Sequence, residues 1–543
     1  MEATKIKNAK DVQDKFLAVS LDQSLRGQNL STSFYMYGHS QLRSAYDEAA
    51  AFSSKGAVKL NLVQSCADTL LNRITKHKPR PTFLTSNGDW DMMVKAQKLE
   101  KYVFGQFYRT NTYKKSKDAA LQALVYGDGF VKVYSENGNP IIEPCLTPEL
   151  MFDERESVYG KPKSMFQMRL VSKEILQDLY PKLADKIENV NPARSPFYMT
   201  GTNFASNLIP VIEYWKLPVG SSKGEHWMVC EELELEQDEW KRKRFPFAQL
   251  GFVKNLVGPY HKGVAEIIKS HQIEVNRTLK RISDSLRLVA SPKVLYDFQS
   301  KIIKTHFNND VGTMIGYAGT APQFVIPPAV GPELFNHLQW TVQSAYQEVG
   351  VSELSAGSRK PAGLDSGKAL REYQDIESER FSAFVTAWDD FHLDVADLLI
   401  EEASANSASV VLAPSKYGAE TIKFSDVKIE KDCYIMQSYP SAMLPKEPAG
   451  RLAYVQEMLG SKLIPPEIGA SLLEFPDIES WTSLINSPID DIKHTISYMI
   501  EKGEYLPPEE NQKIDDISIA MMGGAYLKYK NQGCPQDRLD LIF

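Results

Sequence analysis

A chain of 543 residues is longer than one ordinary domain of about 100–200 residues, and three or four structural units are expected. Apolar residues make up 43% and charged residues 24%, and the 31 glycines and 30 prolines are spread along the chain, which excludes collagen-like and low-complexity classes. The net charge of −7 argues against a protein that grips nucleic acid with its whole surface, but it allows local contacts.

The cysteines and the N-terminal sequence bear on the compartment. The five cysteines lie far apart and form no C-x-x-C pair, which is typical of a reducing environment rather than of a disulfide framework. The first residues lack the apolar core of a signal peptide, and no run approaches the roughly 18 apolar residues of a membrane-spanning helix. We therefore expect a protein that is made and assembled in the cytoplasm without membrane contact.

The first half of the chain reads as an α+β unit that ends near residue 255. Residues 1–57 mix polar and small residues around a Tyr/Met cluster, and we expect a partly ordered arm there. Asn137-Gly138 between two apolar runs predicts a β-hairpin, because these residues accept the positive φ of a tight turn. The periodicity of apolar residues predicts helices and strands at these positions: helices over 60–77, 89–104 and 115–125, and strands over 165–171, 209–217 and 226–235.

The second half contains the most regular helical pattern. After Gly258-Pro259, apolar residues recur at steps of three and four for about 26 residues, or roughly 39 Å, until Ser291-Pro292. Further elements are predicted in this order: a turn-rich piece over 293–330 with strands at 293–296 and 323–326, a helix over 332–349, a loop of small and breaker residues over 353–366, a long helix with an aromatic stripe behind it, strands at 409–412 and 421–429, and short helices separated by proline pairs from 446 onward.

Motifs for catalysis and metal binding are not supported. The segment Gly363–Ala369 has three residues rather than four between its glycines, and Ala369 stands where a phosphate-binding loop needs a hydroxyl for Mg²⁺. The nine histidines show no metal-ligand spacing, and His271 on an apolar stripe is expected to be a packing residue. We therefore predict a non-enzymatic protein with no catalytic residues, no metal site and no cofactor.

Basic clusters are the more informative feature. Between Gly258 and Lys304, nine Lys and Arg stand against four acidic residues, a pattern that most often marks a solvated helix face and otherwise a phosphate-contacting one. A second, short cluster is Trp240–Arg244. Arg359 and Lys360 lie in a flexible loop, where a cation reaches phosphate without a preorganised pocket.

The order of elements resembles the portal proteins of tailed bacteriophages. Tyr126-Gly127-Asp128-Gly129-Phe130-Val131-Lys132-Val133 resembles the strand-entry segment of their wing domains. The helix that runs into a Pro-broken strand over Gly258–Tyr296 resembles their first stem helix, Pro332–Val349 the second, and Gly350–Gly367 the tunnel loop. The stretch Lys368–Ala403 resembles the long helix behind that loop, and the similarity covers roughly residues 60–540.

The resemblance implies an α+β, mainly helical subunit of a ring of about twelve copies. Its parts would be an N-terminal arm over 1–57, a wing over 58–257, a first stem helix over 258–290, a clip over 291–330, a second stem helix over 331–350, a tunnel loop over 351–367, a long wing helix over 368–403, wing strands over 404–445 and a helical crown over 446–543. The crown would hold 16 Asp and Glu against 9 Lys and Arg, which accounts for the whole net charge of −7.

The resemblance also implies a function and partners. The ring would sit at the portal vertex of the capsid, assembled in the host bacterial cytoplasm, and double-stranded DNA would pass through it without sequence recognition during packaging and ejection. Its partners would be the terminase large subunit, the major capsid protein and scaffold, and head-completion or tail adaptor proteins. The terminase would hydrolyse the ATP.

The same resemblance implies site residues. For the tunnel-loop positions, an ion pair between subunits is the alternative to DNA contact. Three groups are expected: tunnel-loop DNA contacts at Arg359, Lys360, Lys368 and Arg371; a channel-facing stem surface at Lys269, Arg277, Lys280, Arg281 and Arg287; and a clip docking surface at Lys293, Lys301 and Lys304. The competing interpretation is another non-enzymatic virion structural protein, such as a head–tail adaptor. A nucleotidyl-transfer enzyme or ATPase would need a phosphate loop or carboxylate triad that the sequence lacks.

Overall fold

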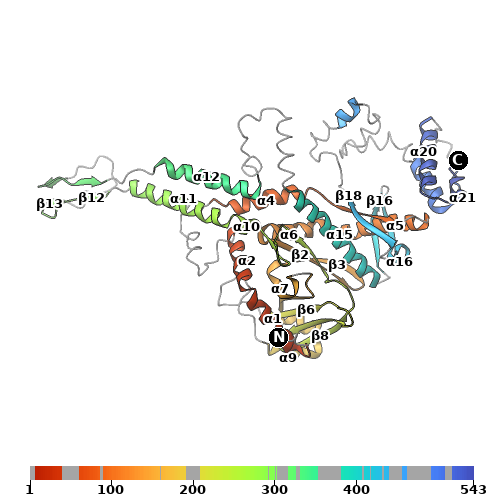
Figure 1. The fold of residues 1–543 in the computed structure, drawn as a ribbon, viewed down its shortest axis with the longest axis horizontal. Helices are drawn as coiled ribbons and strands as arrows, with labels where there is room; N and C mark the ends of the chain where they lie inside the picture. The colour runs from red at the N-terminus through yellow and green to blue at the C-terminus, as the bar shows by residue number, and fades with distance from the viewer. Residues whose placement is uncertain are drawn as a thin grey trace.

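The computed structural model describes most of the chain and shows a mixed α+β protein, as the sequence predicted (Figure 1). A pair of long helices projects from an α+β body, and C-terminal helices lie at the opposite end of the long axis (Figure 1). The described residues are 6–38, 60–85, 90–158, 161–190, 208–290, 293–299, 301–302, 316–325, 331–351, 381–405, 409–415, 418–430, 433–439, 455–461, 491–507 and 516–542.

The elements follow one another in this order. The long helices are α1 (Ala9–Asp22), α2 (Ser24–Tyr37), α4 (Leu62–Ile74), α5 (Trp90–Arg109), α6 (Thr112–Tyr126), α11 (Lys269–Ala290), α12 (Pro332–Val349), α15 (Ser382–Ala405) and α20 (Asp516–Asn531). The short helices are α7 (Glu154–Ser157), α8 (Lys173–Leu179), α9 (Ala184–Glu188), α10 (Val264–Ile267), α16 (Phe424–Val427) and α21 (Gln536–Leu539), and residues 455–460 and 491–502 are also helical.

The strands form small antiparallel sheets. They are β1 (Arg80–Thr85), β2 (Asp128–Glu136), β3 (Asn139–Cys145), β4 (Leu150–Phe152), β5 (Ser164–Ser172), β6 (Leu208–Lys216), β7 (Gly224–Cys230), β8 (Leu233–Trp240), β9 (Phe247–Gly251), β10 (Val253–Lys254), β11 (His261–Lys262), β12 (Lys293–Leu295), β13 (Lys301–Ile302), β14 (Tyr317–Ala318), β15 (Gln323–Val325), β16 (Val410–Ser415), β17 (Gly418–Lys423) and β18 (Tyr434–Tyr439). The two larger sheets have the strand orders β3–β2–β9 and β4–β5–β6–β7–β8.

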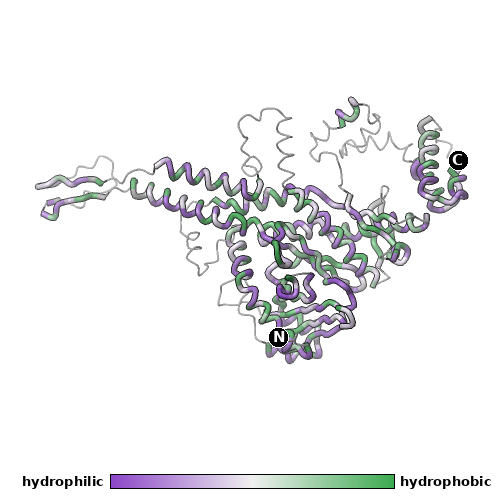
Figure 2. Tube along the Cα trace, viewed as in Figure 1, coloured by the Kyte–Doolittle hydropathy of each residue, from purple (hydrophilic) through white to green (hydrophobic). Residues whose placement is uncertain are grey.

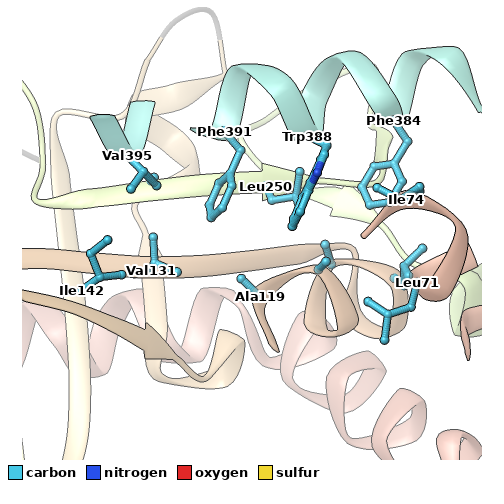
Figure 3. Close-up of a cluster of buried hydrophobic side chains, with 14 of the residues drawn as sticks. Leu71, Ile74, Ala119, Val131, Ile142, Leu250, Phe384, Trp388, Phe391 and Val395 are labelled. Carbon is cyan, nitrogen blue, oxygen red and sulfur yellow. The ribbon is translucent and has the colours of Figure 1, made fainter. Parts of the chain in front are cut away.

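The largest hydrophobic core lies between α15 and the sheet β3–β2–β9, with α6 and α4 closing its other side (Figure 3). α15 supplies a stripe at steps of three and four residues, which is the aromatic stripe expected from the sequence. Its side chains and their partners are Phe384, Trp388, Phe391 and Val395 from α15, and Ile74, Ala119, Val131, Ile142 and Leu250 from the elements below. The predicted start of this helix, 368–380, lies outside the described residues.

The hairpin β2–β3 forms where the Asn-Gly sequence predicted it. Asn137 and Gly138 have φ values of 50° and 79°, the conformation of a two-residue turn whose twist matches that of the strands. Pairing runs from Glu136 opposite Asn139 to Phe130 opposite Cys145. The turn therefore sets the register of a strand that is buried over most of its length.

The five-stranded sheet packs against the N-terminal segment, which the sequence predicted as a partly ordered arm. Residues 6–38 form α1 and α2, and α1 buries Phe16 and Val19 against Tyr214 of β6 and Trp227 of β7. Helices α8 and α9 bury Leu176 against Val211 and its neighbours. Since successive residues of a strand point to opposite faces, α1 and α8–α9 cover the two faces of this sheet. The helical spacing of Val12, Phe16 and Val19 is the sequence pattern that indicates α1.

The Gly-Asp-Gly sequence after α6 forms a close junction in the body. A Cβ on Gly129 would lie 1.8 Å from the carbonyl oxygen of Ala119, and Gly127 has a φ of +103°. The carboxylate of Asp128 accepts hydrogen bonds from Nδ1 of His261 at 2.7 Å and from its backbone N–H at 3.1 Å. These contacts hold β2 against α6 and against the strand that leads into α10 and α11.

The segment before α11 differs from the predicted helix over 258–290. His261 and Lys262 form β11, which pairs with β10 across the expected boundary at residue 257. Helix begins at Val264 and is interrupted at Ile268 before α11 starts. Gly263 is the extended residue before this helix and lies so close to Val125 that a Cβ would meet its carbonyl oxygen at 2.4 Å, so a side chain does not fit there.

Residues 404–445 pair partly with segments far away in sequence. β16 and β17 form a hairpin, whereas β18 pairs with β1, a strand that the sequence analysis missed. The predicted strand over 421–429 turns into the short helix α16 at Phe424, whose ring is buried against Tyr102 of α5. In the described part of 446–543, the residues 491–502, α20 and α21 surround Trp90 of α5.

Candidate nucleic-acid and assembly interface

The most distinctive feature outside the body is the projecting limb, which we define as α11, the strands β12–β15 and α12. α11 has 22 residues and α12 has 18, so the helices extend about 33 and 27 Å at 1.5 Å per residue. α12 has exactly the range expected from the sequence: Pro332 is its first residue, and Gly350 ends it in the left-handed conformation. Figure 2 shows hydrophilic and hydrophobic stretches alternating along both helices.

The base of the limb is anchored by a buried glutamine. Gln272 of α11 is 2% exposed. Its Oε1 accepts hydrogen bonds from the backbone N–H groups of Leu62 at 2.8 Å and Val63 at 3.3 Å, and its Nε2 donates to the carbonyl of Leu60 at 2.7 Å. The side chain thus satisfies the first N–H groups of α4, which have no partner within their own helix. This polar contact fixes α11 to the body.

The two limb helices pack through small and apolar groups and through ion pairs. Val275 of α11 and Ala345 of α12 are fully buried and belong to the largest core. His271 lies 3.2 Å from the carboxylate of Glu348, and His337 lies 3.4 Å from that of Glu274. His271 is therefore a packing residue between the helices, as the sequence predicted, and the two contacts bracket the register of α11 and α12.

The outer surface of α11 carries the predicted cations. Arg277, Lys280 and Arg281 are exposed, and Lys269 is half-buried near the base. Arg281 lies 4.0 Å from Glu274, a distance at which a solvent-exposed pair contributes little stability. The side chain of Arg287 lies outside the described residues. Three of the five predicted stem residues thus share one exposed surface.

α12 has a different surface. It contains no Lys or Arg, and its charged residues are Glu333 and Glu348. Trp340 is 63% exposed, and exposed amides such as Gln343 lie on the same side; Phe335, 48% exposed, lies about 140° around the helix. A large exposed aromatic side chain on a side poor in charge is typical of protein–protein interfaces rather than of a solvated face.

The tip of the limb is small, β-structured and apolar. β12 pairs with β15, and β13 with β14, in the antiparallel sense. Lys301 is exposed; Lys293 lies in β12, but its side chain is outside the described residues, as is the whole of Lys304. Large apolar side chains are exposed here, with Phe298 at 95%, and the others are Leu295, Tyr296, Tyr317 and Val325. An apolar patch at the end of a projection is typical of a docking surface.

The remaining predicted site lies outside the described residues. These are the tunnel-loop cations Arg359, Lys360, Lys368 and Arg371. In the short basic cluster at Trp240–Arg244, Lys241 and Lys243 are exposed, whereas the two arginines contact the body. Arg244 lies 2.9 Å from Asp397 and 3.1 Å from Glu401, and Arg242 pairs with Glu402, so these two arginines bind the acidic side of α15.

A buried charge network was missed by the sequence analysis. Lys132 of β2 lies 2.5 Å from Glu213 of β6, and Nε2 of His226 lies 3.0 Å from the other oxygen of that carboxylate. Burial raises the pKa of Glu213, but Lys132 and His226 outweigh it and the pKa lies below its usual value. Lys132 also lies over the ring of Trp215 at 4.8 Å. The network joins the two larger sheets, and single residues in separate strands gave no spacing signal.

His392 is a second buried titratable group. Its ring is enclosed by Trp388, whose centroid lies 4.4 Å away, and by Tyr113, stacked at 5.5 Å. Nδ1 donates a hydrogen bond to the carbonyl of Trp388 at 2.8 Å, while Nε2 is buried without a partner. Burial lowers the pKa of His392 to about 4, so the ring is neutral at pH 7. It is a packed core histidine.

Three further features of the described residues concern metal binding, membrane crossing and cavities. Within the described ranges, no three His, Cys, Asp or Glu side chains gather in a way that would hold a metal ion. No helix in this part of the chain is long and apolar enough to cross a bilayer. An apolar hollow of about 220 Å³ lies between α2 and α6, lined by Phe34, Tyr37, Leu121 and Tyr126 among others.

Comparison with known proteins adds no identification. No protein-family model matches the sequence, and no curated protein matches it significantly.

Proposed function

We propose that the chain is the subunit of a ring-shaped portal of a tailed bacteriophage, a conduit for double-stranded DNA at one vertex of the capsid. The observation that carries the proposal is the projecting limb, in which two antiparallel helices leave an α+β body and end in small antiparallel strand pairs. The order of these elements is the one that the resemblance predicts for stem, clip and stem.

The surface of α11 supports contact with a moving polyanion. Arg277, Lys280 and Arg281 are exposed on one helix, and cations of this kind bind phosphates by releasing counterions, without reading the sequence. A conduit needs contacts that are individually weak, since deep base-reading contacts would stop the DNA. Exposed cations on a rigid helix meet that need, and the tunnel-loop cations are proposed to act in the same way.

The tip is proposed as the docking surface for the terminase during packaging and for adaptor proteins afterwards. Exposed aromatic residues such as Phe298 and Tyr317 supply contact area at a low entropic cost. The body is proposed to contact the capsid protein and scaffold.

The size and shape of the purified protein test this proposal. Native mass spectrometry and negative-stain microscopy of the full chain should show a centrally pierced ring of about 730 kDa, twelve copies of a 61.2 kDa chain. A species of 61.2 kDa that persists at high protein concentration and capsid-like salt would refute the portal proposal and favour an adaptor.

DNA binding by the ring gives a second readout. Changing Arg277 and Arg281 together to Gln should reduce the salt dependence of DNA binding, because each lost phosphate contact lowers the slope by about 0.9. Changing the exposed Lys114 and Lys117 of α6 to Gln removes the same charge from the body and serves as the matched control. Equal effects of the two double changes would contradict a channel role for α11.

A further inference from the structure

The outer surfaces of α11 and α12 differ in a way that indicates how the limbs of two copies meet. The side of α11 that faces α12 carries His271 and the buried Thr278. Residues two positions away lie about 200° around a helix, so Ile273 and Lys280 are on the side turned away from α12. Ile273 packs partly against the largest core and is otherwise accessible, while Lys280 and, one turn further along, Asp284 are exposed. This side of α11 combines a partly accessible apolar side chain with a cation.

The opposite side of the limb belongs to α12. Trp340, Gln343 and Gln347 recur at steps of three and four residues and are all exposed. Glu333 is exposed near the tip-side end of the same helix. This side of α12 therefore has a tryptophan flanked by amides and an acid near one end, and the helix contains no Lys or Arg. It complements the Ile273–Lys280 side of α11 because the apolar side chains can pack together and the charges are opposite.

The heights of these residues also agree. The contacts of His337 with Glu274 and of Glu348 with His271 bracket the register of the antiparallel helices. Counted from them at equal rise per residue, Trp340 lies at the height of α11 residues 271–279, a range that includes Ile273. By the same count Glu333 lies at the height of residues 278–286, a range that includes Lys280. Copies related by an axis parallel to the limb place equal heights side by side, so the two surfaces would meet in register.

We propose that α12 of one copy docks on α11 of the next copy, with Trp340 packed on Ile273 and Glu333 paired with Lys280. The partner is thus a second copy of this chain, bound head-to-tail, and the inference rests on the proposed ring. Arg281, one residue and about 100° beyond Lys280, is left directed to the channel. Lys280 is thereby reassigned from DNA contact to the interface between copies.

Charge exchange tests the pairing. Lys280→Glu and Glu333→Lys should each raise the protein concentration needed for ring assembly about tenfold, since each sets like charges against one another in every interface. The double variant carrying both changes should assemble within about twofold of the wild type, because the pair is restored with its signs exchanged. Arg281→Glu, the same charge change on the channel side, should assemble like the wild type.

Packing and proximity give independent readouts. Trp340→Ala should weaken assembly by about tenfold or more, whereas Tyr108→Ala, an exposed aromatic residue on α5, should not. Ile273→Cys with Trp340→Cys in one chain should form covalent multimers on oxidation, and each single cysteine should not. Suppose the wild type forms rings, but the double charge variant does not regain assembly and the two cysteines do not cross-link. The pairing of α12 with α11 is then refuted, while the portal proposal stands. A wild type that stays monomeric refutes both.

Discussion

Removing the side chain of Gln272 should loosen the joint between the limb and the body. In Gln272→Ala, the buried N–H groups of Leu62 and Val63 lose their acceptor, and the carbonyl of the more exposed Leu60 loses its donor. A buried polar group left without a partner costs about 1–3 kcal/mol. Water that enters the vacated space recovers part of this cost, and we expect a net loss of about 3 kcal/mol.

Hydrogen exchange of the full-length protein measures this effect locally, without assuming two-state unfolding. A loss of about 3 kcal/mol corresponds to roughly hundredfold faster exchange at the first amides of α4. Gln97→Ala removes an exposed glutamine from α5 and is the matched control, with exchange in α4 unchanged. If α4 exchanges at the same rate in Gln272→Ala and in the control, the glutamine does not anchor the limb and our reasoning is wrong.

Two further predictions concern the body. Burial lowers the pKa of His392 from 6.5 to about 4, so the unfolded chain binds more protons than the folded one below pH 6.5. The free energy of unfolding is therefore unaffected above pH 6.5 and falls by up to about 3 kcal/mol as the pH drops to 4. His392→Phe should lose less stability between pH 7 and 4.5 than the wild type in thermal unfolding, whereas His494→Gln, at an exposed position, should follow the wild type; parallel pH profiles for all three would disprove the role of burial. Gly129→Ala should abolish soluble protein, because its Cβ would overlap the Ala119 carbonyl. In the control Gly523→Ala in α20, the new Cβ meets nothing within 4 Å, and the change should be neutral or stabilise by up to about 1 kcal/mol. Soluble yield and thermal midpoint measure both effects, and a normally folded Gly129→Ala would show that the close contact between β2 and α6 is not required.

Local sequence signals predicted the parts of the fold that depend on local physics. α12 was predicted to the residue, because Pro332 fits the first turn of a helix and Gly350 the left-handed position after it. The hairpin β2–β3 followed from Asn137-Gly138. In each case the residues that determine the structure lie inside the element or next to it.

What the sequence did not reveal depends on partners far away in the chain. β1 was missed because its pairing strand, β18, lies more than 300 residues later. Lys132, Glu213 and His226 come from three strands, and only the packing of the two sheets brings them together. The same holds for Arg244, whose acidic partners Asp397 and Glu401 lie more than 150 residues later in α15.

Both ends of the limb are built into the largest core of the body. Val264 and Ile268, just before α11, and Val349 and Val351, at and just after the end of α12, are all buried in that core. The buried Gln272 and the His261–Asp128 contact tie the same base to α4 and β2. A close-packed interior transmits displacement rather than absorbing it. A displacement of the limb would therefore be transmitted to the core between α15 and the three-stranded sheet.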